Sequence, residues 1–169
     1  MNFPVFPLNG AVLFPNTNLP LNIFEDRYLE MVNDAIKKDK LMGMTQSKKA
    51  EKEVYKVGCL GKISDYQKSR DGRILINLSG ITRFEILEEN KNSKLYREFK
   101  VDYKKFTLDL DTNFQPFNIN PLLQKAEVFF KKNGLLLNWN EFKKLDDMRK
   151  INTLAMIAPV TNEEKQKLL

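Results

Sequence analysis

Few residues in this sequence could carry out chemistry, and their spacing argues against catalysis. There is no histidine, which removes the Ser-His and Cys-His catalytic pairs and the commonest transition-metal ligand. Asp109 and Asp111 lie in a polar segment without a partner acid or base, and the adjacent Asp146 and Asp147 would point in different directions on a helix. Cys59, the single cysteine, is predicted to be a small buried residue rather than a reactive thiol. We therefore expect no catalytic residue, no metal site and no cofactor.

Nucleotide-binding motifs are absent as well. The sequence contains neither G-x-x-x-x-G-K-[ST] nor G-x-G-x-x-G, and its seven glycines form no glycine-rich loop. The net charge of +6 and the pI of about 9.3 would suit RNA or another anionic partner. The lysines, however, are spread along the chain as pairs with acids close by, which is typical of a solvated surface. We therefore do not expect nucleic acid as a partner.

Cysteine content and hydropathy favour a cytoplasmic location. One cysteine cannot form a disulfide framework, which fits a reducing compartment. No apolar run is long enough to span a membrane, and the first residues lack the basic and apolar regions of a signal peptide. The 169 residues, of which 42% are apolar and 30% charged, predict one globular domain, or one domain with a small appendage, that makes no membrane contact.

The first half of the sequence has the pattern of a β-rich domain. Three prolines, at positions 7, 15 and 20, break residues 3–24 into extended pieces. The apolar residues Tyr28, Leu29, Val32, Ala35 and Ile36 then recur at helical spacing and predict a helix over 26–38. The charged run 46–53 is predicted to be an exposed loop. Strands are predicted over 41–45, 54–66, 73–78, 81–89 and 95–103.

Particular residues refine this set of strands. Gly58 and Gly61 indicate a bulge or a close backbone approach, and Asp71-Gly72 predicts a tight hairpin turn. In the last strand, alternation places Leu95 inward and Tyr96 outward. Short strands joined by hairpin turns predict an antiparallel barrel or sandwich.

The second half of the sequence is helical. Residues 107–120 are polar and are predicted to be a linker. Asn120 and Pro121 suit the start of a helix that Gly134 ends. Further helices are predicted over 140–145 and 146–158, and a last one begins at a capping box of Thr161 and Glu164. Trp139, the only tryptophan, is expected to pack between these helices.

Three segments carry a family resemblance. They are FPLNGAVLFPNTNLPLNIFEDRYLEMVNDAI from residue 6, VGCLGKI from residue 57 and DGRILINLSGITRFEILEE from residue 71. In this order and spacing they resemble the N-terminal, substrate-recognition domain family of the ATP-dependent protease Lon, which also occurs as small stand-alone bacterial proteins. LAMIAPVTNEEKQKLL, at the end of the chain, resembles the helical tail of those stand-alone members. Asn16 stands where family members often have glycine, and asparagine also adopts left-handed φ angles.

The resemblance implies an α+β fold. Residues 1–106 would form a PUA-like β-pseudobarrel with one covering helix, residues 107–120 a linker, and residues 121–169 a C-terminal α-helical subdomain. In Lon this domain has no chemistry of its own and contacts unfolded or tagged proteins. The P-loop ATPase and the Ser-Lys protease are separate downstream domains, and neither is present in this sequence.

Five residues are candidates for polypeptide binding, and each has a structural alternative. Phe14 and Leu19 could expose an apolar surface or lie in the core. Arg27 and Tyr28 match the family's R-Y pair, but Tyr28 could pack on the barrel and Arg27 could pair with a nearby acid or carbonyl. Arg83 lies with Glu85 on the outward face of a strand, where a cross-strand ion pair is the default explanation.

Two functions of different classes are consistent with these patterns. The leading hypothesis is a non-catalytic module that binds unfolded or extended protein clients near the junction of barrel and helices, or that acts as an adaptor for a separate protease or chaperone. The alternative is an RNA-binding module, since PUA-like folds include RNA binders and the chain is basic. A hydrolase would need a nucleophile and a base that the sequence does not supply.

Overall fold

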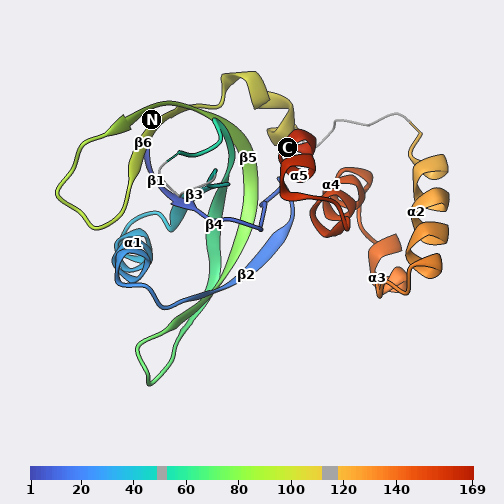
Figure 1. Ribbon diagram of the computed structural model, residues 1–169, viewed down its shortest axis with the longest axis horizontal. Helices are drawn as coiled ribbons and strands as arrows, with labels where there is room; N and C mark the ends of the chain where they lie inside the picture. Colours follow the sequence, from blue (N-terminus) through green and yellow to red (C-terminus); the bar gives the residue numbers. More distant parts are fainter. Residues whose placement is uncertain (49–52, 112–117) are drawn as a thin grey trace.

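The chain forms a β-barrel followed by helices (Figure 1). The computed structural model describes residues 1–48, 53–111 and 118–169. The strands are β1 Asn2–Pro7, β2 Asn18–Ile23, β3 Leu41–Thr45, β4 Val57–Lys68, β5 Ile74–Asn90 and β6 Glu98–Asp102. The helices are α1 Asp26–Lys37, the 3-10 helix η1 Lys104–Leu110, α2 Asn120–Lys132, α3 Trp139–Lys143, α4 Asp147–Ile157 and α5 Asn162–Leu168. A β-rich part followed by a helical part confirms the predicted α+β class.

The long strand β5 closes the barrel. The sheet order is β2-β5-β4-β3-β1-β6, with an additional pairing between β5 and β6. The first part of β5 pairs with β2 from Ile74 to Ser79, and its last part pairs with β6 from Glu85 to Asn90. Five strands therefore form a closed ring, while β2 lies outside the ring and has one strand neighbour among the described residues.

Helix α1 covers the apolar interior of the barrel. Tyr28, Val32 and Ala35 of the predicted stripe are buried, and Leu29 and Ile36 are half-buried against the same core cluster. The helix begins with an acid and ends with a lysine, which complements its dipole. Both the bounds and the buried face of this helix confirm the prediction.

Strand β5 is continuous through Gly80, where the sequence predicts a break between two strands. The backbone of Phe14–Pro15 crosses β5 at this position. A Cβ atom on Gly80 would lie 2.1 Å from the carbonyl oxygen of Phe14. Only glycine therefore lets the Phe14–Pro15 segment cross β5 at this point. Gly58 shows the same effect, since its Cβ would lie 2.5 Å from the Met44 carbonyl oxygen, and the predicted bulge appears as a register shift between Leu60 and Gly61.

Two predictions of exposure were wrong. Gln46 and Ser47, at the start of the predicted exposed loop 46–53, are buried, because α5 packs over them and Gln46 Nε2 donates to the Asn162 carbonyl oxygen at 2.8 Å. Residues 49–52 of that loop lie outside the described residues.

Leu95 is exposed and Tyr96 is buried, the reverse of the predicted alternation. The Tyr96 hydroxyl donates to Asp34 on α1, which draws the ring under the helix.

The helices after the barrel form a small second core. It consists of Phe130, Phe142 and Leu154, and Trp139 packs edge-on against both phenylalanines as expected. Gly134 ends α2 with a φ of +64°, and the predicted capping box starts α5. Asn120 is the first residue of α2 rather than its cap, which is Ile119.

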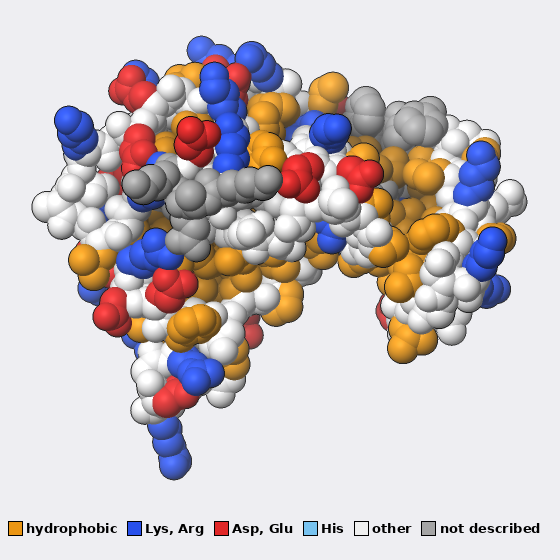
Figure 2. Space-filling view, in the orientation of Figure 1, with side chains coloured by type: hydrophobic (Ala, Val, Ile, Leu, Met, Phe, Trp, Pro, Cys, Tyr) orange, Lys and Arg blue, Asp and Glu red, His pale blue; other side chains and the backbone are white. Residues whose placement is uncertain are grey.

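The predicted linker is partly helical, and the parts that it joins frame a hollow. Residues 107–110 of the linker belong to η1, and residues 112–117 lie outside the described residues. In Figure 2 the molecule is hollowed between the barrel and the helices α2 and α3, and hydrophobic side chains line both sides of the hollow. Within the described ranges, no helix combines the length and hydrophobicity needed to cross a membrane.

Candidate functional site

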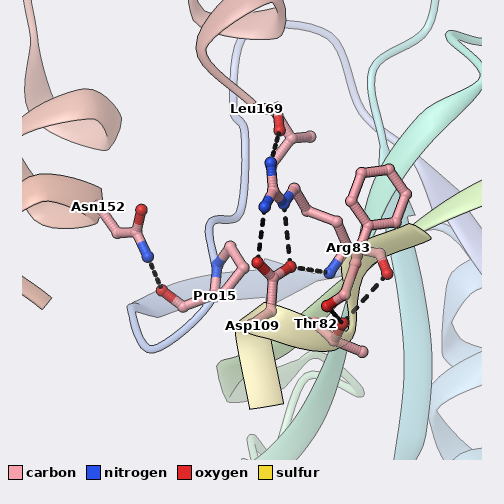
Figure 3. A network of polar contacts seen from close by, with 7 residues as sticks. Pro15, Thr82, Arg83, Asp109, Asn152 and Leu169 are labelled. Carbon is pink, nitrogen blue, oxygen red and sulfur yellow. Dashed lines mark hydrogen bonds and ion pairs between the residues drawn. The ribbon is translucent and has the colours of Figure 1, made fainter. Parts of the chain in front are cut away.

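An ion pair with a buried carboxylate joins β5 to the segment that follows the barrel (Figure 3). Arg83 on β5 donates from Nε and a terminal nitrogen to the two carboxylate oxygens of Asp109 on η1, at 2.9 and 2.7 Å. The Asp109 side chain is only 4% exposed. The hydrogen bond that Arg83 donates to Asp109 raises the pKa of Arg83 above its usual value, so the guanidinium stays charged.

The same arginine also holds the last residue of the chain. Its other terminal nitrogen donates to the carbonyl oxygen of Leu169 at 3.0 Å, and the Leu169 side chain packs on the barrel core. The prediction that Arg83 and Glu85 form ion pairs with a neighbouring strand is therefore wrong: Arg83 pairs with Asp109, and Glu85 pairs with Lys105. Both bonds lead to η1, because the outer surface of β5 is covered there by the chain's own continuation.

Uncharged hydrogen bonds complete the junction of barrel and helices. Asn152 on α4 donates to the Pro15 carbonyl oxygen at 2.8 Å, and Gln166 on α5 donates to the Val57 carbonyl oxygen at 3.0 Å. With the bond from Gln46, these contacts attach α4 and α5 to the barrel. The junction thus fixes one end of the helical part beside β2.

The other candidate residues do not gather into one surface. Phe14 is 1% exposed, as the core alternative predicts, and Leu19 is half-buried against the barrel core. Arg27 pairs with Glu25 at 2.9 Å and stacks over the Tyr28 ring, with its guanidinium 4.5 Å from the ring centre. Tyr28 is buried against Phe6, 4.2 Å between ring centres, and its hydroxyl donates to the Pro7 carbonyl oxygen at 3.4 Å. These residues stabilise the barrel and its covering helix.

A different surface lies along β2, the strand outside the ring. Leu19, Leu21 and Ile23 stand opposite Leu78, Ile76 and Ile74 and point toward the core. The alternate residues Asn18, Pro20 and Asn22 are exposed, because successive side chains of a strand point to opposite sides. We define the β2 face as the free edge of β2 together with the outward side chains of Pro20, Phe24 and Leu75.

Pro20 indicates which backbone groups the free edge presents. A proline is tolerated in a paired strand when its nitrogen points away from the neighbouring strand. The N–H groups of Asn18 and Asn22 then share the direction of the Pro20 nitrogen, since backbone groups alternate along a strand. These two donors are directed to the open side of β2.

The β2 face changes from polar to apolar along its length. At one end, the Ser79 hydroxyl donates to Asn18 Oδ1 at 2.6 Å, and its oxygen lies 3.0 Å from the Ser64 hydroxyl oxygen. At the other end Phe24 and Leu75 are 62% and 45% exposed. Between Asn18 and Ile23 there is no charged side chain. An uncharged surface of this kind suits an extended polypeptide better than an anion.

Helix α4 forms a wall beside the polar end of the β2 face. A cleft of about 430 Å³ lies there, between the turn at Asn16 and the α4 residues Arg149 and Thr153. Asn16 has a φ of +59°, the left-handed conformation expected for it, and this bends the chain into β2. The cleft is continuous with the free edge because both include Asn18.

The described residues offer the β2 face neither a metal-ligand cluster nor an ionised thiol. Within residues 1–48, 53–111 and 118–169, no cluster of three potential metal ligands occurs. Cys59 is buried, and burial raises the pKa of its thiol well above the ordinary value, so it is not a nucleophile near neutral pH. The surface can bind through hydrogen bonds and apolar contacts.

Sequence reasoning missed the exposed residues that build the β2 face. Phe24 and Leu75 were not among the candidates, although each stands in an otherwise well-predicted segment. The available signal was Pro20, because proline within a run of strand residues indicates an edge strand. Which side of that edge faces the helices depends on the later segment 146–158 and has no local signal.

Comparison with known proteins gives the same family along the whole chain. The profile of the ATP-dependent protease La (LON) substrate-binding domain matches residues 2–169. The Lon protease of Flavobacterium johnsoniae is 31% identical over an alignment of 94 positions, gaps included, that covers 52% of this chain and 12% of that protein. Lon protease 1 of Hydrogenovibrio crunogenus is 27% identical over an alignment of 178 positions, gaps included, that covers 99% of this chain and 22% of that protein. The chain therefore spans about a fifth or less of the length of these curated relatives.

Two solved structures share the fold. A Lon N-terminal domain protein from Xanthomonas campestris superimposes with a TM-score of 0.61 at 20% identity, over 99% of this chain and 96% of that one. The N-terminal domain of a Lon protease from the Mycobacterium avium complex gives a TM-score of 0.68 at 14% identity, over 99% and 89% of the two chains.

Proposed function

Because this chain belongs to the family of substrate-binding domains of the ATP-dependent protease La (Lon), we propose that it is a non-catalytic module that binds unfolded or extended polypeptide. It would act in the cytoplasm, alone or as an adaptor that delivers clients to a separate protease or chaperone. The observation that carries the proposal is the free edge of β2 beside the hollow between barrel and helices.

Backbone pairing supports binding that tolerates many sequences. A client strand added along β2 would bond to Asn18 and Asn22 through its main chain, and main-chain bonds do not depend on side-chain identity. Natural edge strands are usually blunted by charge or proline. Here Pro20 removes one donor, but no charge protects the edge from Asn18 to Ile23.

The apolar end of the β2 face supports a preference for apolar clients. An apolar side chain of a client would cover part of the exposed surface of Phe24 and Leu75. Burial of apolar surface contributes about 25 cal/mol per Å² to the free energy of binding. The edge alone gives RNA phosphates no cation to contact, so it does not favour the RNA-binding alternative.

The proposal is tested by comparing one protein in its folded and unfolded forms as a probe. A fluorescently labelled, disulfide-containing protein that has been reduced and carboxymethylated stays unfolded without denaturant. We expect fluorescence anisotropy to show binding of this form and none of the oxidised, folded form. Equal binding of both forms, or of neither, would contradict the proposal.

Asn22 offers a matched pair of variants that locates the site. Asn22→Pro removes an edge donor, whereas Asn22→Ala removes the same side chain and keeps the N–H. We expect Asn22→Pro to weaken binding about 2- to 10-fold, the contribution of one hydrogen bond, and Asn22→Ala to bind like the parent. If binding occurs but the two variants bind alike, the client lies elsewhere on the molecule.

A further inference from the structure

Helix α2 has apolar side chains on two sides. One side packs into the helical core, and the other is exposed. Its inner side contributes Phe130 to the helical core, where that ring contacts Trp139. On the outer side Val128 and Phe129 are 67% and 48% exposed. Exposed apolar side chains next to each other at this level are typical of interaction surfaces.

Two lysines flank these apolar residues at helical spacing. Lys125 and Lys132 are seven residues apart, about 10 Å along the axis, and Val128 and Phe129 lie between them on the same side of the helix. Together with Gln124, these four residues line a shallow depression of about 370 Å³. We define the α2 patch as Lys125, Val128, Phe129 and Lys132.

The two lysines of the α2 patch differ from their neighbours in how they pair within the described residues. Lys131, one position before Lys132, pairs with Glu127 at 3.2 Å, and Lys143 approaches the same carboxylate at 3.9 Å. In the part of the chain that the structure describes, by contrast, Lys125 and Lys132 have no ion-pair partner. Figure 2 shows basic side chains along the outer side of α2.

We propose that the α2 patch docks an acidic amphipathic helix of a partner protein. The matching helix carries two apolar residues between acids seven positions apart, so that each acid meets a lysine while the apolar side chains cover Val128 and Phe129. A second copy of this chain does not fit, because an antiparallel pairing of two α2 patches would place Lys125 against Lys132. This partner site is separate from the β2 face and does not depend on it.

The test uses two helical peptides of opposite charge. Each has about 15 residues with two adjacent leucines. One carries glutamates and the other carries lysines at the two flanking positions, seven residues apart. We expect the glutamate peptide to bind and the lysine peptide not to bind when fluorescence anisotropy is measured at low salt. The double variant Lys125→Glu/Lys132→Glu should lower the affinity for the glutamate peptide at least about tenfold and should bind the lysine peptide instead.

Two further variants distinguish the contribution of the α2 patch to binding from effects of net charge and of unfolding. Lys56→Glu/Lys91→Glu changes the net charge equally but on exposed positions of the barrel part, and should bind the glutamate peptide within about twofold of the parent. Val128→Ser should lower the affinity for the glutamate peptide, while the helix content of the protein by circular dichroism stays unchanged, because Val128 is exposed.

Equal affinity for both peptides, or dissociation constants above about 1 mM, would overturn the proposal. Binding to phosphatidylglycerol vesicles without binding of the glutamate peptide would overturn it too, in favour of a membrane surface.

Discussion

The barrel and the helical part of this molecule are stabilised to different degrees by burial. The barrel has two core clusters, and glycines let its backbones cross at short distance. The core cluster of the helical part has three buried residues, and the contacts of this part with the barrel include polar contacts at Pro15, Gln46 and Arg83 and the packing of Leu169. The barrel is therefore the rigid scaffold, and the helices can open locally without it, since opening free energies follow local burial.

The same Phe→Ala truncation in each core should show the largest difference between the barrel and the helical part. Phe84, in the barrel, and Phe142, in the helices, are 1% and 3% exposed. Each Phe→Ala change is expected to cost about 3–5 kcal/mol. Phe84→Ala should raise hydrogen exchange in the strands and make Cys59 reactive to thiol reagents. Phe142→Ala should raise exchange in α2–α4 only, with Cys59 still protected. Reaction of Cys59 in both variants at the same rate would show one cooperative unit.

Glycine substitutions should show how tightly each part is built. Gly80→Ala places a methyl group against the Phe14 carbonyl, so we expect it to lower the free energy of unfolding by about 3 kcal/mol. Gly134→Ala meets no atom within 4 Å and costs only the left-handed backbone conformation, about 1 kcal/mol. Urea denaturation measures both. A Gly80 variant as stable as the Gly134 variant would mean that the crossing of the two backbones relaxes freely.

The ion pair at the junction should have an intermediate effect. Arg83→Met leaves the buried Asp109 without its partner and should cost about 2 kcal/mol, less than for a fully buried pair because the arginine is one-third exposed. The double variant Arg83→Met/Asp109→Leu should recover most of this loss. Urea denaturation of all three proteins gives the coupling energy, and additive effects would exclude direct coupling.

A second bidentate pair, at the surface of the barrel, should contribute least. Arg97 holds both carboxylate oxygens of Glu89 and lowers the pKa of that carboxyl below its usual value. The stabilisation is therefore present above the ordinary glutamate pKa and is lost as the pH falls through the lowered one. Because the Glu89 side chain is 46% exposed, we expect less than about 1 kcal/mol. Glu89→Gln should remove this part of the pH dependence of thermal unfolding, and an unchanged profile would contradict the assignment.

The sequence predicted what depends on local periodicity. Helix 26–38, strand 41–45 and the turn at Gly72 follow from spacing and turn chemistry, and the structure has all three. The burial of Phe14 and Cys59 was also among the expected alternatives.

What the sequence did not predict depends on contacts between distant segments. Gln46 is buried by α5, more than a hundred residues later, and Arg83 meets Asp109 rather than a neighbouring strand. The exposed position of Phe24 likewise reflects the place of β2 outside the ring, which local alternation does not encode. The candidate site was therefore less predictable than the fold.

The pairing of β1 sets the order in which the barrel can form during synthesis. Asn2–Pro4 pairs with β6, while Val5–Pro7 pairs with β3, so β1, which is synthesised before both partners, shares its length between segments about 40 and about 95 residues later in the chain. Until β6 emerges, Phe3 and Val5 lack part of their final surroundings and stay available to other chains and to chaperones. A domain that is proposed to bind unfolded proteins would thus itself be a client for much of its own translation.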